Sequence, residues 1–163
     1  MNILLVRHAE AEDDPFPEVL RPLTQRGRKS ARGLAKKILS MDLQIDNIVS
    51  SPLTRAVQTS EILLQAFRKH HSVRHVECRM ELASDFLPDS FARETFFSFL
   101  SDYFPGTLLL VGHEPELLTL AHWISPEKFP KNNGSGLRKA NALFFEWDPG
   151  SGGHFHGRIS PIN

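Results

Sequence analysis

Short apolar runs recur along the chain, separated by polar or helix-patterned stretches. Runs of this length, rich in β-branched and aromatic residues and bounded by turn residues, are typical of buried strands. The clearest runs cover residues 2–6, 107–111 and 142–147, and shorter or weaker ones cover 45–49, the stretch through Val76 and 154–159. We expect each of these runs to form a strand.

Between these runs, apolar residues recur at helical spacing. Thr24 is the natural N-cap of a first helix, whose apolar face reaches Met41. A second helix is expected to begin at residues 50–52, with a serine cap and a proline in its first turn. Its apolar stripe, counted from Leu53, is Leu53, Val57, Ser60, Leu64 and Phe67. Further helices are expected over residues 91–104 and from Pro115 onward.

The alternation of strands and helices predicts a fold of the α/β class. Parallel strands joined by helices need both faces of the sheet covered, which gives a three-layer α/β/α sandwich. The last two runs are joined by Asp148-Pro149-Gly150 and a short glycine-rich turn, so they are expected to form an antiparallel hairpin at the edge of the sheet.

Length and composition narrow the class of protein. The 163 residues predict one domain over 1–163. The 19 basic and 19 acidic residues balance, so we expect neither nucleic acid nor a membrane as partner. Cys78 is the single cysteine, which fits a reducing compartment. No apolar stretch is long enough for a membrane span, and the apolar N-terminal run lacks a basic leader, so a soluble, cytoplasmic protein is expected.

Phosphate-binding side chains follow three of the predicted strands. Arg7 and His8 end the first run, Arg55 follows the second, and His113 follows the run at 107–111. The carboxyl ends of parallel strands share one edge of a sheet, where ligands bind, so these residues are expected to converge. Guanidinium groups bind phosphoryl oxygens and an imidazole can attack phosphorus. The sequence therefore predicts a phosphoryl-transfer site.

Four sequence blocks resemble the signature of the histidine phosphatase superfamily, in the same order along the chain. The blocks cover residues 5–10, 23–27, 50–59 and 111–115. The short chain and the segment Arg21-Pro22-Leu23-Thr24 are similar to the compact SixA-type branch, which dephosphorylates phosphohistidine on signalling proteins. The resemblance implies a phosphoglycerate mutase-like fold and a reaction that needs no metal or other cofactor.

The resemblance also implies a role for each site residue. His8 is the expected nucleophile, attacking as the neutral imidazole, with its other nitrogen donating to a backbone carbonyl. Arg7, Arg55 and a protonated His113 are expected to surround the phosphoryl group. Arg21 is a further candidate for binding the anion.

Two positions depart from the family pattern. Ala9 stands where the superfamily usually has glycine, and a small effect is expected. Glu81 falls near the place of the general acid of many relatives, although its surroundings do not match the fuller motif of the larger members. An ordinary surface glutamate is the alternative for Glu81.

The resemblance and the predicted site together indicate a metal-independent phosphatase that forms a phosphohistidine intermediate. Its expected substrate is phosphohistidine on a signalling protein. Two alternatives stay open, namely a phosphatase of a small phosphorylated metabolite and a non-catalytic phosphate-binding module. A cysteine phosphatase is excluded, because its motif needs Arg six positions after the cysteine and Ser84 stands there.

Overall fold

The computed structural model describes residues 1–83, 93–129 and 136–162. Its centre is a six-stranded sheet in the order β3-β2-β4-β1-β5-β6. The strands are β1 (Asn2–Arg7), β2 (Asn47–Ser50), β3 (His75–Cys78), β4 (Thr107–Gly112), β5 (Ala142–Asp148) and β6 (Gly152–Ile159). The first four in spatial order are parallel, and β5 and β6 are antiparallel to their neighbours. The predicted parallel sheet with an antiparallel edge is confirmed.

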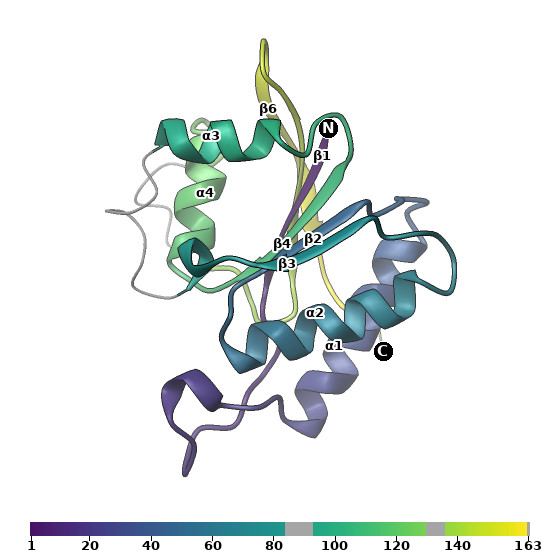
Figure 1. Ribbon diagram of the computed structural model, residues 1–163, viewed down its shortest axis with the longest axis vertical. Coiled ribbons are helices and arrows are strands. Elements are labelled where there is room, and N and C mark those ends of the chain that lie inside the picture. The colour runs from purple at the N-terminus through teal and green to yellow at the C-terminus, as the bar shows by residue number, and fades with distance from the viewer. Residues whose placement is uncertain (84–92, 130–135, 163) are drawn as a thin grey trace.

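Helices cover both faces of the sheet, as predicted (Figure 1). One face packs against α1 (Gln25–Leu39) and α2 (Thr54–Phe67), and the other against α3 (Arg93–Ser101) and α4 (Glu116–Ile124). Short 3-10 turns lie at η1 (Glu18–Leu20) and η2 (Met80–Leu82).

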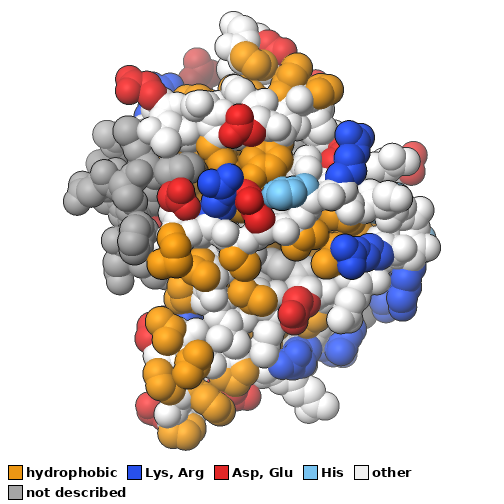
Figure 2. Space-filling view, viewed as in Figure 1, with side chains coloured by type: hydrophobic (Ala, Val, Ile, Leu, Met, Phe, Trp, Pro, Cys, Tyr) orange, Lys and Arg blue, Asp and Glu red, His pale blue; other side chains and the backbone are white. Residues whose placement is uncertain are grey.

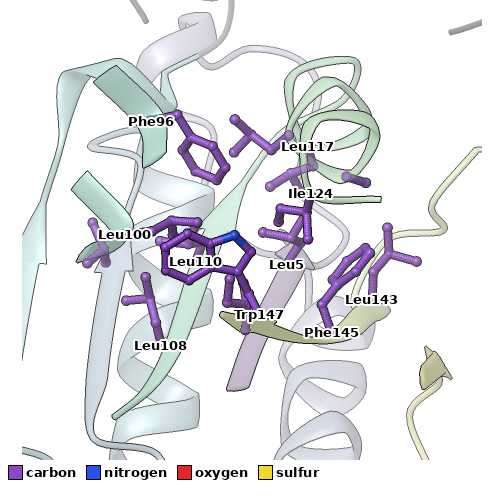
Figure 3. Close-up of a cluster of buried hydrophobic side chains, with 14 of the residues drawn as sticks. Leu5, Phe96, Leu100, Leu108, Leu110, Leu117, Ile124, Leu143, Phe145 and Trp147 are labelled. Atoms are coloured by element: carbon purple, nitrogen blue, oxygen red, sulfur yellow. The ribbon is translucent and has the colours of Figure 1, made fainter. Parts of the chain in front are cut away.

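Alternate side chains of the central strands supply two separate apolar cores. Leu4 and Val6 of β1 lie in the core beneath α1 and α2, whereas Ile3 and Leu5 lie in the core beneath α3 and α4. Figure 3 shows this second core, in which Leu5 and Leu110 of the sheet lie among side chains from α3, α4 and β5. Successive strand residues point to opposite faces, so the near-continuous apolar runs of β1 and β4 are explained by burial on both sides.

The first predicted helix start is confirmed and the second is wrong. The Thr24 hydroxyl accepts a hydrogen bond from the Gly27 amide at 2.8 Å and caps α1. In contrast, α2 begins at Thr54, and Leu53 precedes it without a side-chain cap. Of the five residues predicted for one face, Leu53, Ser60 and Phe67 are buried, while Val57 and Leu64 are partly exposed. The other buried apolar residues of α2 are Ala56, Ile62 and Leu63.

No helix among the described residues is both long and apolar enough to cross a bilayer.

Candidate active site

The candidate site is built where the three adjacent strands β2, β4 and β1 end. The register pairs Arg7 with Gly112 on β4 and Ser50 with Val111. Just beyond these pairs, the His8 amide donates to the Gly112 carbonyl at 3.0 Å, and the Ser51 amide donates to the Val111 carbonyl at 2.8 Å. Backbone hydrogen bonds that continue the sheet thus hold His8 and Ser51 beside the end of β4.

Hydrogen bonds fix both nitrogens of the His8 ring. Nδ1 lies 2.7 Å from the Ala9 carbonyl oxygen, and Nε2 lies 3.3 Å from Nε of Arg55. A carbonyl can only accept and a guanidinium can only donate. The proton of the neutral ring is therefore on Nδ1, and the electron pair of Nε2 accepts from the Arg55 guanidinium. This is the tautomer that the sequence analysis expected for a nucleophile.

The environment of His8 keeps the ring neutral. Its side chain is buried, and its pKa is lowered from 6.5 to about 4, with burial as the largest cause. The cations of Arg55 and Arg7 contribute to the lowering, whereas the hydrogen bond to Ala9 opposes it. At neutral pH Nε2 is therefore unprotonated, as a nucleophile must be.

The backbone that carries His8 is held by α2. The amide of Ala9 donates to Oγ1 of Thr59 at 3.1 Å, and that hydroxyl donates to the carbonyl of Arg55 at 2.7 Å. Ala9 itself is fully buried. The strand end and the helix that carries Arg55 are therefore locked together through one threonine.

His113 faces His8 from the end of β4. The two ring centroids are 5.0 Å apart, and Nε2 of His113 lies 2.8 Å from Oγ of Ser51. Burial is the main cause that lowers the His113 pKa to about 3, and interactions with His8, Arg55 and Arg7 contribute to this value. His113 is therefore neutral in the ligand-free site, because a third buried cation beside two guanidiniums is too costly. A protonated His113 around a bound phosphoryl group stays a prediction.

The two site arginines are held by different partners. Arg55 is only 4% exposed, and beyond its contact with His8 it donates to Glu18, through Nη2 to the carboxylate at 2.7 Å and through Nη1 to the carbonyl at 2.8 Å. Arg7 donates through Nη1 to the Glu114 carboxylate and to the Leu137 carbonyl, both at 2.7 Å. Carboxylates thus hold both guanidiniums from outside the site.

Two buried nitrogens of this cluster have no hydrogen-bond partner among the described residues. They are Nε of Arg7 and Nδ1 of His113. Buried polar atoms are nearly always paired in folded proteins, so two such atoms at one strand edge indicate a place for a ligand. A guanidinium N–H there suits an anion.

Arg21 and Glu81 differ in their contacts from the four central residues of the site, which are Arg7, His8, Arg55 and His113. The Arg21 guanidinium is bound by carboxylates of its own loop, those of Glu18 at 2.8 Å and Asp13, and by the Glu12 carbonyl at 2.6 Å. Glu81 is half-buried in η2, just after β3. Contact of either residue with phosphate stays a prediction.

Sequence reasoning missed the residues that hold the four central residues in place. Ser51 was interpreted as a helix cap, yet its hydroxyl contacts His113. Glu18 and Glu114 were given no role, yet each binds one of the site arginines. Only Thr59 had a usable signal, since it lies four residues after Arg55 and so on the same face of a helix.

Histidines outside the site have ordinary structural partners. His71 accepts from the Ile45 amide at 3.0 Å and stacks on Phe67. His75 lies 3.2 Å from the Glu77 carboxylate. Within the described part of the chain, no group of three or more His, Cys, Asp or Glu side chains is arranged to hold a metal ion.

Comparison with known proteins finds a matching family model and several relatives. Residues 3–83 match the model of the histidine phosphatase superfamily (branch 1). The serine/threonine-protein phosphatase Pgam5, mitochondrial, of Drosophila ananassae is 32% identical over 77 residues, which is 47% of this chain and 26% of that protein. Its Drosophila melanogaster counterpart is 38% identical over 64 residues, 39% of this chain and 22% of that protein. The chain thus matches about a quarter of the length of these relatives.

Solved structures match nearly the whole chain. The protein histidine phosphatase SixA complexed with tungstate gives a TM-score of 0.83 at 22% identity, covering 99% of this chain and 97% of that one. The putative phosphohistidine phosphatase SixA from Agrobacterium tumefaciens gives 0.77 at 20% identity, covering 98% and 97%. At these identities the likeness concerns the fold, which is the predicted phosphoglycerate mutase-like one. The chain thus combines a match to the histidine phosphatase superfamily over residues 3–83 with the fold of the SixA structures.

Proposed function

We propose that this protein is a phosphatase that works through a phosphohistidine intermediate on His8. One observation carries the proposal, namely that Nε2 of His8 holds an electron pair while Nδ1 is tied to the Ala9 carbonyl and Arg55 lies 3.3 Å away. A neutral, oriented imidazole beside a guanidinium can attack a phosphoryl group. A module that only bound phosphate would not need its imidazole held in this tautomer.

The chemistry follows in two displacements. In the first, Nε2 of His8 attacks phosphorus, and an N–P bond forms while the bond from phosphorus to the leaving atom breaks, with its electron pair going to the leaving group. In the second, water attacks the phosphohistidine, the N–P bond breaks, and inorganic phosphate leaves. Arg7, Arg55 and His113 donate hydrogen bonds to the phosphoryl oxygens as their charge shifts.

Phosphohistidine on a protein is the substrate class that we favour. Its imidazole leaving group can arrive already protonated, whereas an alkoxide needs a proton from the enzyme. The four central residues include no carboxylic acid, and Glu81 is the one acid that the family pattern suggests. We therefore expect Glu81→Gln to slow turnover of phosphohistidine very little and to slow an alkyl phosphomonoester more. Equal losses on both substrates would argue against this assignment.

The loop that carries η1 supports a protein substrate over a metabolite. Its residues Phe16, Val19 and Leu20 are 43%, 58% and 58% exposed, and hydrophobic and acidic side chains gather on it at the lower left of Figure 2. Glu18 of the same loop binds Arg55, so this apolar surface adjoins the site. Contiguous exposed apolar surface beside a site is typical of protein docking.

A substrate competition tests this choice. Phosphohistidine protein and a panel of phosphorylated metabolites are offered together, and the kcat/KM ratio is measured for the wild type and for Val19→Ser. We expect Val19→Ser to raise KM for the phosphoprotein by about 5- to 10-fold, the effect of one lost apolar contact, and to leave a small aryl phosphate unchanged. Ile162→Ser is the matched control, because Ile162 is 44% exposed elsewhere on the surface. Preference for one metabolite, with no effect of Val19→Ser, would instead favour a metabolite phosphatase.

A further inference from the structure

We propose that Ser51 is a positioning residue that sets the tautomer of His113, so that neutral His113 presents an N–H at Nδ1 to the phosphoryl group. This inference rests on the proposed function for its purpose, but its structural content concerns the ligand-free protein. Ser51 follows β2 and lies next to the end of β4. It touches no substrate in the proposed reaction and acts only through His113.

Ser51 is held more tightly than a surface serine. It is fully buried, and its amide donates to the Val111 carbonyl at 2.8 Å. Its carbonyl accepts from the hydroxyl of Ser50 at 2.8 Å. With the backbone fixed at both ends, the Ser51 hydroxyl has a defined place beside the His113 ring.

The hydrogen bonds at this hydroxyl favour one direction for its bond to His113. The Leu53 amide donates to Oγ of Ser51 at 3.3 Å. Oγ retains its own hydrogen, and His113 Nε2, 2.8 Å away, is in place to accept it. A neutral imidazole that accepts at Nε2 carries its proton on Nδ1.

The opposite tautomer would leave the site worse matched. If His113 carried its proton on Nε2, the Ser51 hydroxyl would accept twice, and Nδ1 would be a bare electron pair. Nδ1 is buried, with no partner among the described residues, so a bare pair there would repel a phosphoryl oxygen. With the proton on Nδ1, the same atom is a donor, which suits an anion.

This arrangement supplies a hydrogen bond without a third positive charge. Arg7 and Arg55 already act electrostatically on His113, so adding a proton to this ring is unfavourable before the anion binds. A serine-fixed neutral donor avoids that cost. It is also present at every pH at which His8 is neutral, so donor and nucleophile stay available over the same range.

The direct test is the tautomer of His113 in the ligand-free protein, read from nitrogen-15 chemical shifts and two-bond couplings of the imidazoles at neutral pH. His113→Gln identifies the resonances. The wild type is expected to show His113 protonated at Nδ1, and Ser51→Ala to lose that preference. Protonation at Nε2 in the wild type, or an unchanged tautomer in Ser51→Ala, would overturn the proposal.

Ser60 supplies the matched control. It is a buried serine on α2 whose hydroxyl donates to the Ala56 carbonyl at 3.0 Å. We expect Ser51→Ala to lower kcat/KM and the affinity for inorganic phosphate by about 10- to 100-fold, as for other groups that orient a ligating histidine. Ser60→Ala should change them by less than about 3-fold. Equal effects of both variants would indicate a merely structural role for Ser51.

The two readouts keep this proposal separate from the proposed function. If the wild type has the expected tautomer and binds phosphate but turns over no substrate, the proposed function fails and the role of Ser51 stands. If turnover is normal and the tautomer is the opposite one, only the role of Ser51 fails.

Discussion

At the scale of the residue, the central feature is a histidine whose pKa is shifted by its surroundings. Burial lowers the His8 pKa from 6.5 to about 4, with Arg55 and Arg7 adding to the effect. A nucleophile must be unprotonated, so the active form of the free enzyme persists well below pH 6.5.

The pH dependence of kcat/KM tests this directly. After correction for the ionisation of the substrate itself, the acid limb is expected near pH 4 and not near 6.5. His8 and His113 lie close together, so the limb reports the pair and not one ring. An acid limb of kcat/KM near pH 6.5 would mean that burial does not lower the His8 pKa.

Glu18 gives a second prediction at this scale. Its carboxylate lies between Arg55 and Arg21, and the hydrogen bond from Arg21 is the main cause of its lowered pKa. A carboxylate beside the anion site repels the anion. We expect Glu18→Gln to lower the inhibition constant of inorganic phosphate, a competitive inhibitor, by about 3- to 10-fold. This change corresponds to about 1 kcal/mol of relieved repulsion between exposed charges.

Glu12→Gln is the control for the Glu18 experiment, because Glu12 is exposed on the same loop and binds Arg21 through its carbonyl. It should leave the inhibition constant unchanged. Weaker inhibition by phosphate in Glu18→Gln would show that Glu18 mainly orients Arg55 instead of competing with the anion.

The positions of the four central residues were predictable because each follows an apolar run, and strand ends share one edge. The contacts that these residues make were not predictable. Glu18 reaches Arg55 from a distant loop, and Ser51 turns toward His113 instead of capping a helix. Such choices depend on tertiary distances, which local spacing does not contain. The roles of Arg21 and Glu81 stay predictions.

At the scale of the element, α1 is positioned by a close approach to the strand end. A Cβ added at Gly27 would lie 2.0 Å from the backbone oxygen of Glu10, and this same carbonyl accepts from the Thr24 amide at 3.0 Å. The start of α1 therefore packs directly on the segment that follows His8. Only glycine permits this distance.

Gly27→Ala is expected to destabilise the protein despite the better helix propensity of alanine. The clash is with backbone, which cannot move like a side chain, so we expect a loss of about 1–3 kcal/mol in the free energy of unfolding. Urea denaturation measures it, with Lys29→Ala on the exposed face of α1 as control. A Gly27→Ala protein as stable as the wild type would mean that the helix can shift without cost.

The elements themselves were mostly predictable, because hydrophobic periodicity reflects burial. The strands and the Thr24 cap are confirmed. The start of α2 was predicted wrongly, since Ser-Ser-Pro is a common helix start, whereas here Ser50 ends β2 and the helix begins only at Thr54. Tertiary contacts of the serine override its capping preference.

At the scale of the whole molecule, the two buried histidines of the site make the free energy of unfolding depend on pH. His8 and His113 have pKa values of about 4 and about 3 in the folded protein, and about 6.5 when unfolded. Between these values the unfolded chain binds more protons than the folded one, so the free energy of unfolding decreases as pH falls from 7 toward 4.

This pH dependence is measurable by chemical denaturation at a series of pH values. Each histidine is expected to contribute on the order of 3 kcal/mol at most over this range. The double variant His8→Asn with His113→Asn should have a shallower slope between pH 6.5 and 4. The same slope in wild type and double variant would show that other groups dominate the acid sensitivity.

The most direct test of the proposed mechanism is to trap the phosphorylated enzyme. The protein is mixed with radiolabelled phosphohistidine protein, quenched in alkali within milliseconds to preserve a phosphoramidate, and mapped by mass spectrometry. We predict an acid-labile phosphoryl group on His8, formed in a burst and absent from His8→Ala, while His154→Ala, an exposed histidine on β6, behaves as the wild type. Turnover with no label on His8, or undiminished turnover by His8→Ala, would contradict the account.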